Sequence, residues 1–132
     1  MEFSRKAILC LCHDDMTLRV RRLLLEHFGY KVLAANSLQE TTKLLHDSCP
    51  DMLLMDNTYP GHDYEDTAET AKSICPELLA VVLMPGYALR SGENGSIDRF
   101  LPIDGPREEW LAELQSLFSE QDRQYRIRCS AN

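Results

Sequence analysis

The feature that most constrains the fold is a short apolar run that ends in a single carboxylate. Pro50-Asp51 is a turn signal, the residues from Met52 to Met55 are all apolar, and Asp56 follows them directly. The run is too short for a typical helix and lacks polar alternation, so it predicts a strand buried on both faces, as in a parallel sheet. Because open sheets of this kind bind ligands at the carboxyl ends of their strands, Asp56 is the first candidate site residue. The alternative is an ordinary turn aspartate.

Similar apolar segments alternate with helical patterns along the chain. Strands are predicted at residues 7–12, 30–35, 52–55, 78–84 and 98–103, and helices at 16–28, 37–48, 64–74 and 106–120. A proline and three glycines within residues 85–95 argue against a regular helix there. Strands and helices that alternate through short connections predict right-handed crossovers and a parallel sheet covered on both faces. We therefore predict an α/β fold, a flavodoxin-like (βα)5 three-layer sandwich with strand order 2-1-3-4-5.

This topology places the ends of the first and third strands side by side. His13 and Asp14 follow the first strand, and Asp56 ends the third, so the three are expected to meet in one crevice. Pro102 cannot donate a backbone hydrogen bond, which predicts an edge position for the fifth strand. The apolar positions of the first helix recur at helical spacing and predict its buried face: Met16, Val20, Leu23, Leu24, His27 and Phe28. Arg21 lies off that face.

Length and charge limit the classes of function. The 132 residues fit one domain, which we assign to residues 1–120, and residues 121–132 form a polar tail that is either mobile or a fraying helix extension. A net charge of −7 argues against general nucleic-acid binding and against an anionic membrane surface. No apolar run approaches the roughly 20 residues of a spanning helix, and the N-terminus does not resemble a signal peptide. A cytoplasmic location is expected.

The five cysteines match no disulfide framework and no zinc motif. Reduced thiols, buried as small apolar side chains, are the prediction. A soft-metal site from Cys10, Cys12 and His13 is the weaker alternative, because the first two share a strand face and the third points away. A reactive thiolate at Cys12 lacks a visible third group to orient it.

The order and spacing of these segments resemble a receiver domain of two-component response regulators over about residues 6–120. Asp56 to Asp63 resembles the family's D-x-x-M-P-G-x-D loop, with Tyr59 in the place of methionine. Further matching segments are Ile8-Leu9-Cys10-Leu11 with the acidic turn and Arg19 that follow, Gly29-Tyr30-Lys31-Val32, Pro50 to Asp56, and Gly95 to Pro102.

The resemblance implies a phosphoryl-transfer site at the carboxyl edge of the sheet. Asp56 would accept a phosphoryl group from a phosphohistidine of a sensor kinase or from a small phosphodonor. Two acidic residues after the first strand would hold Mg²⁺ together with Asp56 and the main-chain carbonyl of Thr58. A hydroxyl after the fourth strand and a lysine after the fifth would contact the phosphoryl oxygens. Aspartate is a weak nucleophile, so a hard cation and fixed donors are expected to supply the catalysis.

This chain departs from the family at most of those positions. In an alignment without gaps, the acidic pair falls on Cys12 and His13, and Asp14 comes one place late. The hydroxyl falls on Met84 and the lysine on Ile103, neither of which offers a donor. Each missing charge-assisted contact is expected to cost on the order of 1.5–3 kcal/mol.

Two hypotheses follow for the function. The first is a stand-alone receiver of a two-component phosphorelay with a degenerate site: Asp56 accepts the phosphoryl group, His13 and Asp14 line the acidic pocket, and Asp14, Asp56 and the Thr58 carbonyl are the remaining ligands for Mg²⁺. Cysteine and histidine are poor Mg²⁺ ligands, so binding of this ion is itself in question. The second is a pseudo-receiver, a phosphorylation-independent interaction module.

Both hypotheses describe a signalling protein, and neither assigns it an enzymatic activity. No phosphate-cradling glycine loop follows the first strand, and no pair of nucleophile and base is evident. The expected partners are a sensor histidine kinase, a phosphotransfer protein or another signalling protein, with a homodimer left open.

Overall fold

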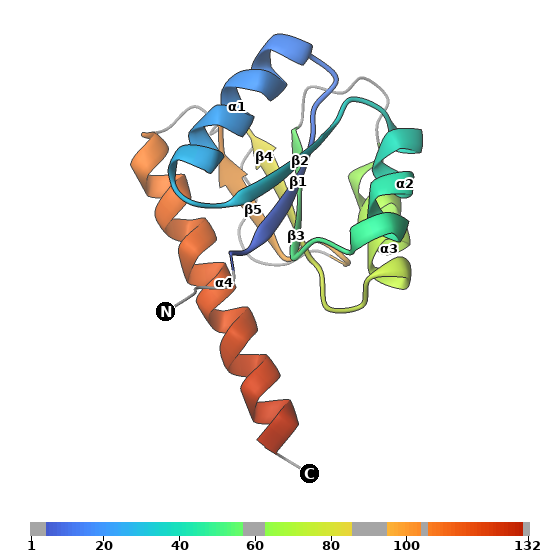
Figure 1. Cartoon of the computed structure of the whole chain (residues 1–132), viewed down its shortest axis with the longest axis vertical. Coiled ribbons are helices and arrows are strands. Elements are labelled where there is room, and N and C mark those ends of the chain that lie inside the picture. Colours follow the sequence, from blue (N-terminus) through green and yellow to red (C-terminus); the bar gives the residue numbers. More distant parts are fainter. Residues whose placement is uncertain (1–4, 57–62, 86–94, 104–105, 131–132) are drawn as a thin grey trace.

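The computed structural model describes residues 5–56, 63–85, 95–103 and 106–130, and these form a five-stranded sheet in the order β2-β1-β3-β4-β5 (Figure 1). All four strand pairs are parallel, which confirms the predicted topology. The elements are β1 Ala7–Leu11, α1 Asp15–His27, β2 Lys31–Ala35, α2 Leu38–Ser48, β3 Met52–Asp56, α3 Tyr64–Ile74, β4 Leu79–Met84, β5 Arg99–Pro102 and α4 Arg107–Ser130.

The sheet lies between two helical layers, as predicted for a three-layer sandwich. Helices α1 and α4 cover one face and α2 and α3 the other (Figure 1). All five residues of β3 are buried, because this strand has a neighbour on each side and helices on both faces. Among the described strands, β5 pairs only with β4, so Pro102 lies at the predicted sheet edge.

Helix α1 faces the sheet with residues other than those predicted. Leu18 and Leu25 are buried, and the Arg21 side chain between them is only 11% exposed. Of the predicted face, Leu24 is partly buried and packs against the core, but other large apolar side chains point into solvent, with exposed fractions of 65% for Met16 and 61% for Leu23. Apart from Leu24 the prediction was wrong, because the helix turns inward another set of residues that share one face, Leu18, Arg21 and Leu25.

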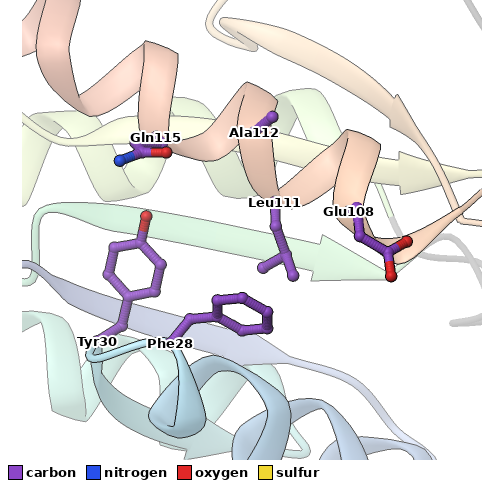
Figure 2. A pocket seen from close by; sticks show the side chains of 6 residues that line it. All are labelled: Phe28, Tyr30, Glu108, Leu111, Ala112 and Gln115. Carbon is purple, nitrogen blue, oxygen red and sulfur yellow. The ribbon is translucent and has the colours of Figure 1, made fainter.

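Helix α4 continues to Ser130, so residues 121–130, predicted as a mobile tail or a fraying extension, are helical. Its first half packs on the sheet through Leu111, Leu114, Leu117 and Phe118, and Figure 1 shows its second half running past the sheet. A pocket of about 230 Å³ lies where α4 meets the end of α1 (Figure 2). Its lining residues are Phe28, Tyr30, Glu108, Leu111, Ala112 and Gln115.

Two of the cysteines predicted to be reduced form a disulfide. Cys49 follows α2, Cys75 follows α3, and their Cα atoms are 5.6 Å apart. Cys10 and Cys12 are buried free thiols, as predicted, and Cys129 is an exposed free thiol. Among the described residues, no helix is both long and apolar enough to cross a lipid bilayer.

Candidate functional site

The candidate site lies at the carboxyl edge of the sheet, where parallel strands bring distant residues together. The register pairs Leu11 with Met55 and Asp56 with Leu83, so the ends of β1, β3 and β4 are aligned. Asp56 is the last residue of β3 and is only 2% exposed. Its main-chain oxygen accepts a hydrogen bond of 3.3 Å from the hydroxyl of Tyr64, at the start of α3.

Arg21 is the partner of the buried Asp56 carboxylate. Its Nη1 atom lies 2.5 Å from Oδ2 of Asp56, and the two side chains are 11% and 1% exposed. A carboxylate is costly to bury without an opposite charge, and the guanidinium supplies that charge. The sequence reasoning missed this residue, although Arg21 lies three residues after Leu18 and four before Leu25, on one helical face.

Cys12 is the second side chain at Asp56. Its Sγ atom lies 3.7 Å from Oδ2 of Asp56 and 3.6 Å from the main-chain oxygen of Asp14. Burial raises the pKa of this thiol above its ordinary value, so the neutral S–H form is favoured and can donate a weak hydrogen bond to the carboxylate. The other carboxylate oxygen of Asp56, Oδ1, is buried and has no hydrogen-bond partner among the described residues.

Asp14 and His13 are exposed rather than gathered around Asp56. Asp14 is the N-cap of α1: its carboxylate accepts a 2.9 Å hydrogen bond from the Thr17 amide and another from the Thr17 hydroxyl. These hydrogen bonds hold the pKa of Asp14 below its usual value. The side chain that meets Asp56 from the end of β1 is therefore Cys12. The expected meeting of His13, Asp14 and Asp56 is replaced by this contact.

The positions expected for the hydroxyl and the lysine carry apolar side chains. Met84 packs with the core on the α2–α3 face, and Ile103 packs with the core on the α1–α4 face. The two are joined through their backbones, because the Ile103 amide donates to the Met84 carbonyl at 2.7 Å. Ile103 also lines a groove of about 280 Å³ beside Arg21. Thr58, whose carbonyl was expected to bind Mg²⁺, lies outside the described residues.

The described residues do not fit a Mg²⁺ site. Magnesium requires oxygen ligands in an octahedral arrangement, yet the neighbours of the Asp56 carboxylate are a thiol and a guanidinium. No group of three or more His, Cys, Asp or Glu side chains is arranged to hold a metal ion within the part of the chain that the structure describes. Among the described residues, the arrangement is a buried carboxylate paired with a guanidinium that also lines the groove beside Ile103.

Solved structures show which fold this is. A response regulator receiver domain protein from Methanospirillum hungatei JF-1 superposes with a TM-score of 0.76 at 18% identity, over 92% of this chain and 99% of that one. The receiver domain of an HD domain-containing protein from Pseudomonas fluorescens Pf-5 gives 0.77 at 19% identity, over 96% of each chain. The chain has the receiver-domain fold.

The receiver fold is shared with structures of varied description. One described as adenylate cyclase from Rhodopirellula baltica gives a TM-score of 0.78 at 18% identity, over 95% of this chain and 96% of that one. No protein-family model matches the sequence, and no curated protein matches it. At these identities the receiver fold is the shared property, and function must be argued from the site itself.

Proposed function

We propose that this chain is a receiver-fold signalling module that works through protein–protein contacts and does not depend on phosphorylation of Asp56. The observation that carries the proposal is the buried ion pair between Arg21 and Asp56. The carboxylate ends β3, where the resemblance to receiver domains leads us to expect a phosphoacceptor, but its charge is already paired with a side chain of the same protein.

The ion pair opposes phosphoryl transfer in two ways. A divalent cation at Asp56 would lie close to the guanidinium of Arg21, and like charges repel strongly in a buried site. Attack through Oδ2 would also require this atom to leave its charge-assisted hydrogen bond to Arg21, whereas attack through Oδ1 would not. Met84 and Ile103 offer no donors that would offset these costs.

The alternative function is a receiver that is phosphorylated at Asp56 by a sensor histidine kinase or a phosphotransfer protein. It is favoured by the place of Asp56 at the end of β3 and by its Oδ1 atom, which has no partner among the described residues. This function would require Arg21 to withdraw before transfer. Under either proposal the partner is another signalling protein, the location is the cytoplasm, and the chain itself is assigned no catalytic activity.

The test is to incubate the protein with Mg²⁺ and acetyl phosphate and to measure its intact mass. Amide NMR spectra with and without beryllofluoride report any structural response. We expect no gain of a phosphoryl mass and no Mg²⁺-dependent shifts. The positive control is the double variant Cys12→Asp, Arg21→Ala, which places a second carboxylate beside Asp56 and removes the resident cation. Mg²⁺-dependent shifts around residue 56 are expected in this variant.

An adduct on the unmodified protein that is absent from Asp56→Asn, together with wide shift changes, would establish the alternative and refute the proposal. Circular dichroism of both variants checks that they remain folded. An adduct that persists in Asp56→Asn would lie on another residue and would leave the proposal for Asp56 intact.

A further inference from the structure

The disulfide between Cys49 and Cys75 joins two helices at the end of the sheet opposite Asp56. Cys49 is the C-cap of α2 and Cys75 is the C-cap of α3, and the two are 26 residues apart in sequence. Each amide donates a hydrogen bond to its own helix, to Leu45 at 3.1 Å and to Ala71 at 2.8 Å. The cross-link therefore connects the last turns of α2 and α3 directly.

The two cysteine residues differ in their exposure to solvent. Cys49 is exposed, whereas Cys75 is only 4% exposed. Thiol–disulfide exchange begins when a thiolate attacks one sulfur along the S–S bond, and the other sulfur leaves. A thiolate from solution can therefore reach Cys49, and the sulfur of Cys75 is then the leaving group.

The surroundings can accommodate both the joined and the separated forms. The Sγ atom of Cys75 lies 3.5 Å from the Leu45 carbonyl oxygen, and that of Cys49 lies 3.8 Å from the Ile74 carbonyl oxygen. Each sulfur would find an acceptor for its S–H group in place after reduction, so the buried thiol would not be left without a partner. Cys49 also has a φ of 42°, a left-handed conformation that costs energy for a residue with a Cβ atom. Reduction of the disulfide removes one of the constraints that hold Cys49 in this left-handed conformation.

Helix α3 is the element on which the cross-link should have the largest effect. Its buried residues, Ala68 and Ala71, are too small to provide much apolar burial, and Tyr64 and Ile74 at its two ends are only partly buried against the core. At its other end, Tyr64 donates to the main chain of Asp56 at 3.3 Å, and Glu65 accepts from the Ser96 amide at 3.1 Å. A weakly packed helix thus connects the disulfide at one end with the candidate site at the other.

We propose that Cys49–Cys75 is a site of reversible thiol–disulfide exchange with low-molecular-weight thiols of the glutathione class, and that it sets how firmly α3 is held on the sheet. A thiolate of the reagent attacks Cys49, a mixed disulfide forms there, and Cys75 leaves and takes up a proton. A second reagent thiolate attacks the reagent's sulfur in that mixed disulfide, which releases the reagent disulfide and the Cys49 thiol. Two electrons pass to the protein, and oxidation by the reagent disulfide is the reverse. This inference is independent of whether Asp56 is phosphorylated.

The experiment uses the Cys129→Ser variant, which removes the exposed free thiol and leaves both buried thiols in place. The protein is equilibrated in glutathione buffers of different ratios without denaturant, quenched with acid and alkylated after unfolding. Intact mass then counts the thiols. We expect the count to rise by two across the series and to return on reoxidation. Hydrogen exchange should become at least about tenfold faster in α3 after reduction, with smaller changes in α1.

Amide NMR chemical shifts of the folded protein distinguish a local effect on α3 from a general loss of stability. We expect the signals of Tyr64 and Ser96 to shift on reduction in the folded protein. Cys49→Gly provides the control, because glycine adopts the left-handed conformation without strain. This variant should fold, should show the fast α3 exchange in every buffer and should not respond to glutathione. A thiol count that changes only after denaturation would overturn the proposal, as would reversible reduction that leaves α3 exchange and these two signals unchanged.

Discussion

Asp56 illustrates how the surroundings of a carboxylate determine what it can do. An exposed aspartate at a strand end is free to bind a cation or to attack a phosphoryl group. At 1% side-chain exposure the same group needs a permanent counter-charge, and Arg21 provides it from the neighbouring helix. The pair is therefore expected to contribute to folding in a way that can be measured by substitution.

Arg21→Met should lower the free energy of unfolding by about 3 kcal/mol, because it leaves a buried charge without a partner. The matched control is Arg22→Met. The Arg22 side chain is 51% exposed and forms an exposed pair with Glu26, so its loss should cost less than about 0.5 kcal/mol. Urea denaturation at neutral pH measures both.

A second variant separates the loss of a partner from the loss of the side chain itself. Arg21→Met combined with Asp56→Leu removes both charges and should recover most of the stability lost in the single variant. If Arg21→Met is no more destabilising than Arg22→Met, the Arg21–Asp56 pair contributes no more to stability than an exposed ion pair does.

Among the helices and strands, the structure differs from the sequence-based prediction in two places: the buried face of α1 and the length of α4. The apolar spacing in α1 indicated a helix correctly but, apart from Leu24, assigned the wrong face, because the inward face combines Leu18 and Leu25 with a charged residue, Arg21, that pairs with Asp56. Its outward apolar side chains then remain in solvent. The pattern of apolar and polar residues within α1 cannot reveal that Arg21 is buried, because its partner, Asp56, lies on a strand far along the sequence.

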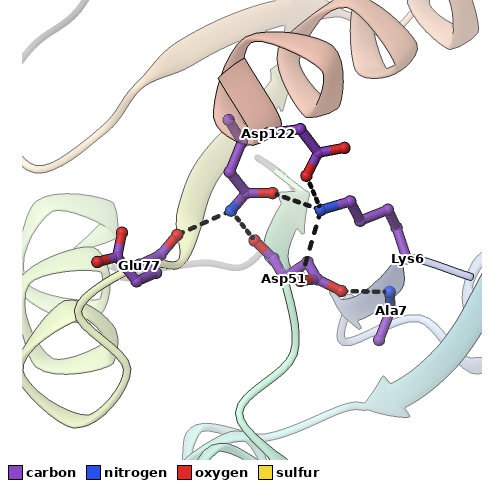
Figure 3. Close-up of polar contacts among 6 residues, drawn as sticks. Lys6, Ala7, Asp51, Glu77 and Asp122 are labelled. Atoms are coloured by element: carbon purple, nitrogen blue, oxygen red, sulfur yellow. Dashed lines mark hydrogen bonds and ion pairs between the residues drawn. The ribbon is translucent and has the colours of Figure 1, made fainter. Parts of the chain in front are cut away.

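Helix α4 extends past the sheet because it is anchored at the amino ends of the strands. The Gln121 side chain donates to the main-chain oxygens of Glu77 at 2.8 Å and of Asp51 at 3.3 Å. Lys6 reaches the carboxylate of Asp122 at 2.6 Å, and Asp51 accepts from the Ala7 amide at 2.8 Å (Figure 3). These contacts join the starts of β1, β3 and β4 to one turn of α4.

Gln121→Ala should therefore destabilise the protein and loosen the second half of α4. Two hydrogen bonds to the main chain are lost, one of them partly buried, for an expected cost of about 1–2 kcal/mol. Gln124→Ala is the control, because Gln124 bonds only with Glu120 on the exposed side of the same helix among the described contacts. Hydrogen exchange should accelerate over residues 119–130 in the first variant alone. Equal exchange in both variants would contradict the anchoring role of Gln121.

For the whole molecule, the sheet could be predicted from sequence because strand order follows from burial. β1 and β4 are apolar throughout and β3 is apolar up to Asp56, which places these three strands in the centre, and Pro102 marks the edge. The position of Asp56 follows from the same pattern. Its partners do not, because the contact between Arg21 and Asp56 joins residues 35 apart and depends on helix rotation. The disulfide was missed for a similar reason: Cys49 and Cys75 become neighbours only when α2 and α3 lie side by side.

The core also determines how the molecule should respond to alkaline pH. Burial raises the pKa of Cys10 from 9.0 to about 12, and burial together with the Asp56 charge raises that of Tyr64 from 10.0 to about 12. In the unfolded chain both groups lose their protons at lower pH, so ionisation favours unfolding. Their contribution to stability is therefore complete below about pH 9 and declines as the pH rises towards 12.

We expect the urea midpoint of the protein to fall progressively above about pH 9. Cys10→Ala should lower stability at neutral pH through lost packing, yet its midpoint should fall less steeply with pH, because one of the groups that ionise on unfolding is gone. Val81→Ala, which shortens a buried side chain of the same core that does not ionise, should keep the slope of the unmodified protein. Because each pKa unit corresponds to about 1.4 kcal/mol, the difference between the two slopes should be resolvable by denaturation at several pH values. Parallel slopes for Cys10→Ala and Val81→Ala would show that the Cys10 thiol ionises as readily in the folded protein as in the unfolded chain.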